Sequence, residues 1–232
     1  MRKIILLLAV LSIMVVMNSC QRAEEVTVTK YFQAMEHNDR DTMSTMANEP
    51  KRIEFKSYEI LSIDQPVTKE LELPKLLKKA EDMEKTKKEQ GIKFLEKSEA
   101  LQDAQDQLDE GGRRGDLVNT IERLKAEVAV ETQKVKDLQQ DINKIKKAIE
   151  REKALITLST AMTENLEMFT GESAQVKVTT RVKLQNNDVK NYIFLLRKDT
   201  LKLEGKVQNG RWIIIKLMDE DEYQKSLTQK EY

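Results

Sequence analysis

The sequence predicts an α+β protein: a small antiparallel sheet with N-terminal helices, interrupted by a long antiparallel coiled-coil helical hairpin. Apolar residues recur every seven residues through the middle of the chain, at residues 72–162, whereas apolar and polar residues alternate on either side. Charged residues make up 34% of the chain and aromatic residues 5%, a composition that favours long charged helices over one large core. The formal net charge of +0 argues against a nucleic-acid partner and against a polybasic membrane patch.

The first 19 residues have the pattern of an export signal. Arg2 and Lys3 give a short positive start, and residues 4–17 form an apolar run. A transmembrane helix needs about 20 apolar residues, so this shorter run fits the apolar part of a signal peptide better. The sequence therefore predicts that residues 1–19 are a signal peptide, removed from the mature chain.

Cys20, the only cysteine, follows this signal directly. With Asn18 and Ser19 before it, the stretch resembles the lipobox of bacterial lipoproteins, although Met17 stands where leucine is usual. The resemblance implies a diacylglycerol thioether on Cys20 and an acylated amine, so that palmitate-type chains anchor the protein in a membrane. Gln21, in place of aspartate, implies the outer membrane by the same resemblance. The alternative is an ordinary secretory signal with an incidental cysteine.

The segment after the signal is predicted to form two helices and one strand. Helical spacing of apolar residues covers residues 24–48, a polar break at residues 37–39 divides the segment, and Asp41 is expected to cap the second helix. Pro50 ends this helical segment. Alternating apolar and polar residues then predict a single strand over residues 51–64.

The C-terminal segment is predicted to add antiparallel strands. Asn186–Asp188 signals a turn, Lys198–Thr200 a bulge or turn, and Asn209–Gly210 a tight hairpin. The remaining residues, 221–232, are expected to be a polar, mobile tail. Strands are expected at residues 174–184, 192–196 and 212–215, with alternation resuming at Leu201 and Leu203. Residues 20–71 and 163–220 are thus predicted to form one discontinuous α+β domain.

The central segment, residues 72–162, carries two apolar stripes at steps of three and four, which is typical of a coiled-coil seam. A glycine-rich turn separates them, in which Gly111 is expected to end the first helix and Asp116 to cap the second. The first stripe is the weaker and includes Leu73, Leu76, Ala80, Met83, Phe94, Leu101, Ala104 and Leu108. The second includes Leu117, Ile121, Leu124, Val128, Val135, Leu138, Ile142, Ile145 and Ile149.

The two stripes predict one antiparallel register. Facing residues of an antiparallel pair have a constant sum of residue numbers, and Leu108 opposite Leu117 sets this sum to 225. Every seam position of one helix then faces a seam position of the other, as in the pair Ala104 and Ile121. A helix of about 36 residues rises roughly 54 Å at 1.5 Å per residue.

Two parts of the hairpin are candidate contact sites. In its middle, Gln90 and Lys97 interrupt the first stripe and Glu131 the second, and Lys97 is expected to reach Glu131. This polar stretch either fixes the register or forms a docking site for a partner helix. At the tip, Arg113 and Arg114 are either a partner contact or part of a soluble turn.

The flanking segments share a pattern with a known superfamily. An aromatic first helix containing Tyr31 and Phe32, an Asn-Asp break, a strand and three further strands ending Gly210-Arg211-Trp212 resemble the nuclear transport factor 2-like superfamily. The resemblance implies a cone: a curved sheet around helices, with a pocket inside. The hairpin departs from this pattern and is expected between the first and second strands.

The chemistry of the predicted cone leaves two interpretations open. Tyr58, Tyr192, Phe194 and Trp212 either line a pocket or form the core of a small domain. His37, the only histidine, lies in a polar turn and is expected to be exposed. No nucleophile motif, phosphate-binding loop or metal-ligand cluster occurs in the sequence, so no catalytic residue, metal or cofactor is predicted.

These observations predict a non-enzymatic, lipid-anchored protein of the bacterial cell envelope, on the periplasmic side of the membrane. Its expected partners are the membrane, through the lipid, and a protein, through the coiled coil. Two alternatives are a periplasmic adaptor of an export system and a small-ligand carrier that uses the cone pocket. The adaptor would need a lipoyl-like β domain followed by a β-barrel domain, and residues after 162 provide too few strands for both.

Overall fold

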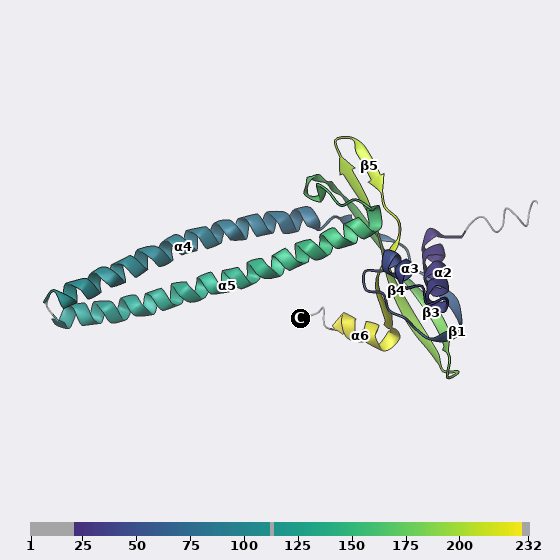
Figure 1. The fold of residues 1–232 in the computed structure, drawn as a ribbon, viewed down its shortest axis with the longest axis horizontal. Helices are drawn as coiled ribbons and strands as arrows, with labels where there is room; N and C mark the ends of the chain where they lie inside the picture. The colour runs from purple at the N-terminus through teal and green to yellow at the C-terminus, as the bar shows by residue number, and fades with distance from the viewer. Residues whose placement is uncertain (1–20, 112–113, 229–232) are drawn as a thin grey trace, which may run out of the picture. The chain divides into compact units, whose positions relative to one another are not determined.

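The computed structural model describes residues 21–111 and 114–228. The protein is α+β and divides into two units (Figure 1). One unit, here called the helix pair, comprises residues Glu72–Lys153. The other, here called the sheet unit, comprises the described residues up to Leu71 and from Ala154 to Thr228.

Two helices open the sheet unit. Helix α2 spans Ala23–Glu36 and helix α3 spans Arg40–Met46, with the expected polar break between them. The predicted cap of α3 is wrong by two residues, because Asp39 and not Asp41 accepts the hydrogen bond from the backbone N–H of Thr42, at 3.0 Å. Asp39 also accepts from the Thr42 hydroxyl, and these two bonds lower the pKa of the Asp39 carboxyl.

The strands form one six-stranded antiparallel sheet. Its central neighbours are β3 and β4, two long strands paired from Thr170 opposite Lys202 to Lys183 opposite Val189. Strands β1 and β2 both pair with β3, whereas β5 and β6 both pair with β4. The bounds are β1 Phe55–Ile63, β2 Val67–Glu70, β3 Thr170–Leu184, β4 Val189–Leu203, β5 Lys206–Asn209 and β6 Ile213–Asp219.

Strand β2 corrects the predicted place of the insertion. Because β2 precedes the helix pair in the chain, the insertion lies between the second and third strands and not between the first and second. The prediction of one strand in this segment failed because all four residues of β2 are exposed, so no apolar alternation marks it.

The turns between the last strands also differ from the prediction. Strand β4 continues through Lys198–Thr200 without a turn, and the tight turn lies at Glu204 and Gly205, which have φ angles of 45° and 80°. Gly210 serves close packing instead of a hairpin, because a Cβ there would lie 2.4 Å from Ser159 Oγ and 2.8 Å from the Asp199 carbonyl oxygen.

The segment predicted to be a mobile tail begins with a helix. Helix α6 spans Glu220–Thr228 and starts with a reciprocal capping pair. The backbone N–H of Glu222 donates to the Asp219 carboxylate at 2.8 Å, and the backbone N–H of Asp219 donates to the Glu222 carboxylate at 3.3 Å. Helix α6 was not predicted because it has no buried residue and therefore no apolar stripe.

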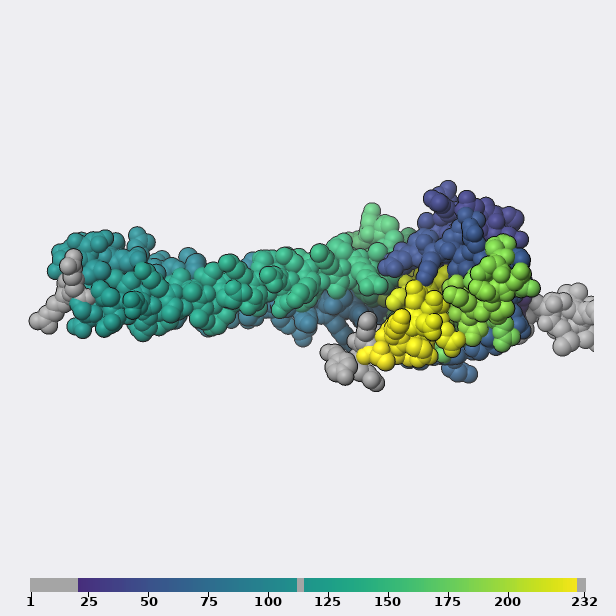
Figure 2. Space-filling view, turned by 90° about the horizontal axis from the view of Figure 1, so that it is seen from below, coloured from purple at the N-terminus to yellow at the C-terminus, as the bar shows by residue number. Residues whose placement is uncertain are grey.

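The central segment forms two long helices. Helix α4 spans Leu73–Asp109 and helix α5 spans Arg114–Thr160, and Gly111 between them has the expected positive φ, 92°. Within the helix pair the two helices lie side by side and run antiparallel (Figure 1, Figure 2). Helix α5 starts two residues before Asp116, so that residue lies in its first turn and does not cap it.

The last turns of α5 belong to the sheet unit, so the division falls at Lys153 and not at residue 162. Leu155 and Ile156 are buried there. Ser159 connects the end of α5 to the strands. Its hydroxyl donates to the Arg211 carbonyl oxygen at 2.9 Å and accepts from the backbone N–H of Asp199 at 3.0 Å.

Candidate functional site

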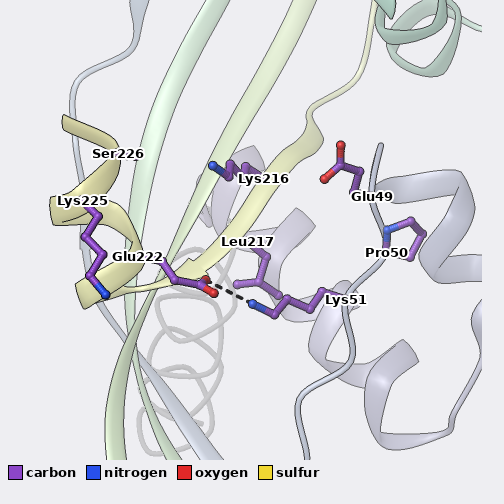
Figure 3. A pocket seen from close by; sticks show the side chains of 8 residues that line it. All are labelled: Glu49, Pro50, Lys51, Lys216, Leu217, Glu222, Lys225 and Ser226. Atoms are coloured by element: carbon purple, nitrogen blue, oxygen red, sulfur yellow. Dashed lines mark hydrogen bonds and ion pairs between the residues drawn. The ribbon is translucent and has the colours of Figure 1, made fainter. Parts of the chain in front are cut away.

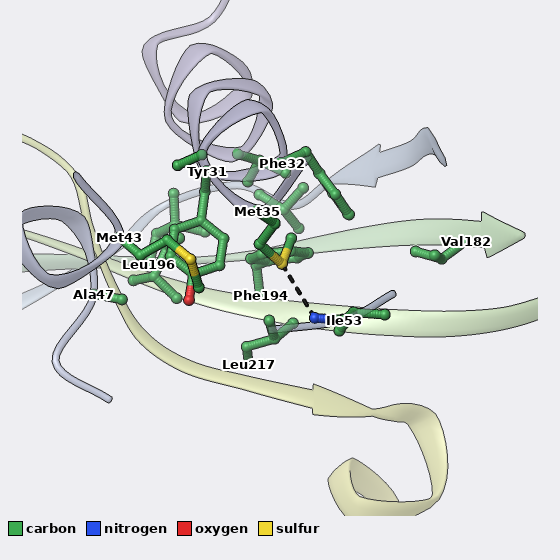
Figure 4. Packing of buried hydrophobic residues seen from close by; sticks show 14 of the residues in the cluster. Tyr31, Phe32, Met35, Met43, Ala47, Ile53, Val182, Phe194, Leu196 and Leu217 are labelled. Carbon is green, nitrogen blue, oxygen red and sulfur yellow. Dashed lines mark hydrogen bonds between the residues drawn. The ribbon is translucent and has the colours of Figure 1, made fainter. Parts of the chain in front are cut away.

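The space between α2 and the sheet is filled with aromatic side chains. The Phe32 ring stacks on the Tyr58 ring with centroids 3.9 Å apart and planes 8° apart. The same ring meets Phe55 edge-on at 5.1 Å and lies tilted against Phe194 at 5.4 Å. Figure 4 shows Tyr31, Phe32 and Met35 pointing from α2 toward Phe194 on β4. Through these rings, helix α2 packs directly on the sheet.

The four residues proposed as pocket lining all contribute to this packing. Phe194 has no exposed surface. Tyr58, Tyr192 and Trp212 are partly buried and pack against the same hydrophobic cluster, which includes Phe32 and Phe194. The structure therefore brings the four residues to one core, as in the second of the two interpretations that the sequence left open.

The Tyr31 hydroxyl is the polar group that α2 contributes to this region. It accepts a hydrogen bond from the backbone N–H of Lys51 at 2.9 Å and donates one to the Lys51 carbonyl oxygen at 3.1 Å. Burial raises the pKa of Tyr31 above its ordinary value, and the bond from Lys51 opposes this shift. The hydroxyl thus ties the segment before β1 to α2.

We expect Tyr31→Phe to lower the free energy of unfolding at neutral pH by about 1–2 kcal/mol, because Lys51 loses both hydrogen bonds. The raised pKa means that the native state holds the Tyr31 proton more tightly than the unfolded chain. The stabilisation by Tyr31 is therefore fully present below about pH 10 and is lost as pH rises further. Urea unfolding of both proteins from pH 7 to 11 measures the difference, and a difference that stays constant to pH 11 would contradict this assignment.

A buried charged pair lies on β4. The guanidinium Nε of Arg197 donates to the Asp199 carboxylate at 2.8 Å, and the two side chains are 5% and 0% exposed. The backbone N–H of Gly210 donates to the Asp199 carbonyl oxygen at 2.8 Å. This pair was not predicted, because residues 198–200 have the pattern of a bulge or turn. Residues 197 and 199 lie in one continuous strand and therefore share a face. The pair lies where β4 meets the β5–β6 connection and the end of α5, a position that indicates a structural role.

A charged hollow of about 480 Å³ lies beside α6 (Figure 3). Lys51 and Glu222 form an ion pair across it, with the Lys51 Nζ 3.2 Å from the Glu222 carboxylate. Both side chains are about half exposed, so this pair adds little stability. The lining residues are Glu49, Pro50, Lys51, Lys216, Leu217, Glu222, Lys225 and Ser226. Charges of both signs and an open position give this hollow no evident catalytic arrangement.

Ionic contacts join the two helices of the helix pair. The Lys146 Nζ lies 2.8 Å from the Glu84 carboxylate, and this contact lowers the pKa of Glu84. Lys97 and Arg123 both bind Glu127 and lower the pKa of its carboxyl.

The expected contact between Lys97 and Glu131 is wrong. Lys97 reaches Glu127, one turn earlier on α5, while Glu131 pairs with Lys134 of its own helix at 3.0 Å. The second carboxylate oxygen of Glu131 and the amide nitrogen of Gln90 are buried and lack a hydrogen-bond partner among the described residues. Within the described residues, the polar middle of the seam is therefore incompletely hydrogen-bonded.

Apolar residues of both helices form one cluster in the part of the helix pair near the turn. Ala104 of α4 and Ile121 and Leu124 of α5 are buried in one cluster, with Leu101 and Leu108 packed against it. Ala104 with Ile121 and Leu101 with Leu124 are two of the pairs whose numbers sum to 225.

Other predicted features cannot be placed in the structure, or carry no site there. Cys20 and Arg113 lie outside the described residues, and Arg114 is the first residue of α5. His37 follows the end of α2 and is exposed. In residues 21–111 and 114–228, no group of three or more potential metal ligands comes together. Across the same residues, no helix is both long enough and apolar enough to span a membrane.

Comparisons with protein-family models, with curated proteins and with solved structures found no match to this chain.

Proposed function

We propose that the chain is a lipid-anchored, non-enzymatic protein of the bacterial cell envelope that binds a protein partner through its helix pair, an antiparallel coiled coil. The observation that carries this proposal is the register of the two apolar stripes. Their residues face each other at a constant sum of 225 in the sequence, and the cluster of Ala104, Ile121 and Leu124 is consistent with that register.

The polar middle of the seam supports a role beyond packing. A seam built for stability alone would be apolar, because a buried polar atom without a hydrogen bond costs about 1–3 kcal/mol. Gln90 and Glu131 each keep one such atom in the described part of the chain. Polar seam residues commonly fix register and partner choice at a cost in stability.

The sheet unit offers less support for small-molecule binding. Phe32, Tyr58 and Phe194 pack against one another between α2 and the sheet, and the resemblance to cone-shaped domains implies a ligand pocket in that region. For this reason we assign the binding of a protein partner to the helix pair. The nuclear transport factor 2-like resemblance is a proposal about the fold of the sheet unit alone.

The lipid anchor is tested in bacterial cells fed a palmitate analogue that carries a clickable group. We expect the wild-type chain to incorporate the label and to sediment with outer membranes, because the proposed acyl chains are attached through Cys20. Cys20→Ser should abolish both results. Equal labelling of the two chains would exclude the lipidation site.

The role of the helix pair is tested by deleting residues 80–145 and closing the gap with a short linker. Because Ala80 faces Ile145 in the proposed register, the deletion leaves a matched stub. We expect the shortened chain to keep the palmitate label and the folded sheet unit, but to lose its protein contacts in cells treated with a crosslinker. If every crosslinked product of the intact chain persists, the helix pair is not the binding part.

A further inference from the structure

The outward face of α4 carries an ordered stripe of charged and apolar side chains. Residues at steps of three and four along a helix share one face, and such a stripe runs from Lys78 to Asp109. We call these residues the outer stripe, and every member is exposed. They are Lys78, Glu81, Lys85, Lys88, Ile92, Leu95, Glu99, Gln102, Asp106 and Asp109. At its centre Ile92 is 50% exposed and Leu95 57% exposed, two large apolar side chains next to each other on a highly charged helix.

Charge reverses across this apolar centre. Before it, the outer stripe contains Lys78, Lys85 and Lys88, with Glu81 as the one acid. After it, the outer stripe contains Glu99, Asp106 and Asp109. No basic residue occurs in α4 between residues 98 and 109. One end of the stripe is thus basic and the other acidic, with the apolar pair between them.

From this pattern we infer that the outer stripe binds the same stripe of a second copy of the chain, antiparallel about a two-fold axis between Ile92 and Leu95. A two-fold interface must be self-complementary. In an antiparallel pairing with a residue sum of 187, Ile92 faces Leu95 twice. The same register places Lys88 opposite Glu99 and Lys78 opposite Asp109.

One like-charge contact remains in this arrangement. Glu81 faces Asp106 of the second copy, but Lys78 and Lys85 flank Glu81 one turn away on either side. Asp106 therefore has two lysines of the other copy within one turn, and Glu81 has the same two lysines one turn away on its own helix.

A hollow of about 630 Å³ lies beside the acidic end of the outer stripe. Gln102, Asp106 and Asp109 of the stripe line it, together with Leu101 of the seam and Lys125 of α5. In the proposed register, the basic end of the second copy, with Lys78 and Lys85, lies against this acid-lined surface. This interface deepens the proposed function by naming one partner of the helix pair.

The test is sedimentation of the full chain in density-matched detergent, comparing wild type with Lys88→Glu, Glu99→Lys and the double variant. We expect wild type to form a dimer that weakens from 0.1 to 1 M salt, because exposed charges are screened over about 10 Å at the lower concentration and 3 Å at the higher. Each single reversal acts twice in a two-fold dimer and should weaken association about tenfold. The double variant, in which the two charges have exchanged places, should return to within about threefold of wild type.

Lys93→Glu is the matched control. Lys93 is an exposed lysine of the same helix that lies outside the outer stripe, so its reversal should leave association unchanged. A monomeric wild-type chain, or single effects that add in the double variant, would overturn the inference. Association that Lys93→Glu weakens equally would also overturn it, because only overall charge would then matter. A monomeric chain that still passes the palmitate and deletion tests would leave the proposed function standing and remove only this interface.

Discussion

Phe32→Ala should destabilise the sheet unit by about 3–5 kcal/mol, the usual cost of emptying a buried phenylalanine site. Phe32 has no exposed surface, and its ring contacts Tyr58, Phe55 and Phe194. These contacts connect α2 to β1 and β4, so the cavity would open between elements that are far apart in the sequence. Each aromatic contact also contributes beyond its buried area, by about 0.5–1.5 kcal/mol.

Chemical unfolding followed by near-ultraviolet circular dichroism measures this effect, because the aromatic cluster dominates that signal. Phe55→Ala is the matched control, since Phe55 belongs to the same cluster but is only partly buried. We expect it to cost about half as much. A loss below about 1 kcal/mol for Phe32→Ala would show that α2 does not pack on the sheet as described.

Gly171→Ala should be the other severe substitution, at about 2–6 kcal/mol. Gly171 has a φ of 148°, and a Cβ there would lie 1.9 Å from the Thr200 carbonyl oxygen. That oxygen belongs to the backbone of the paired strand, so it cannot move aside as a side chain could. The cost combines a strained backbone conformation, about 1–3 kcal/mol, with overpacking, also about 1–3 kcal/mol.

Two other glycines provide controls for this prediction. Gly205 has a φ of 80° but open space around it, so Gly205→Ala should cost only about 1 kcal/mol. Gly91 lies in α4 with no atom near its missing Cβ, so Gly91→Ala should stabilise the helix by up to about 1 kcal/mol. Thermal unfolding of the three variants should give this order, and a Gly171→Ala variant as stable as Gly205→Ala would contradict the strand register at Thr200.

The sequence pattern predicted the parts of the fold that have a repeating apolar side. Residues 73–108 and 117–152 were predicted as the arms of a hairpin, and the helices α4 Leu73–Asp109 and α5 Arg114–Thr160 include them. Strand β3 alternates buried and less buried residues along much of its length, and its C-terminal part was predicted for that reason.

Elements without a buried side were missed, for the same physical reason. Strand β2 is exposed along its whole length. It pairs with β3 through backbone hydrogen bonds, and no side-chain pattern in the sequence predicts such a pairing. Helix α6 depends on the capping pair of Asp219 and Glu222 and has no buried residue. A capping-box search of the polar C-terminal segment would have found its start.

The site residues show a different limit. Pocket lining and core packing both place Tyr58, Tyr192 and Phe194 in one region. Their spacing in the sequence cannot reveal that the Phe32 ring packs against Tyr58 and Phe194 there. For Lys97, the spacing of the seam does not distinguish Glu127 from Glu131, which is one turn further along α5. In the structure Lys97 and Arg123 both bind Glu127.

The proposed function depends most on the register of the helix pair, which pulsed electron paramagnetic resonance measures directly. The full chain would carry Cys20→Ser, one spin label at Leu95 and a second at Asp116, Val130 or Lys144, diluted with unlabelled chain. Leu95 and Val130 sum to 225, whereas each of the other two positions is displaced by 14 residues, about 21 Å along the helix axis. We predict the shortest distance for Val130 and longer, similar distances for Asp116 and Lys144. A shortest distance at Asp116 or Lys144, or a distance to Val130 as long as the other two, would contradict the antiparallel coiled coil and the function proposed for it.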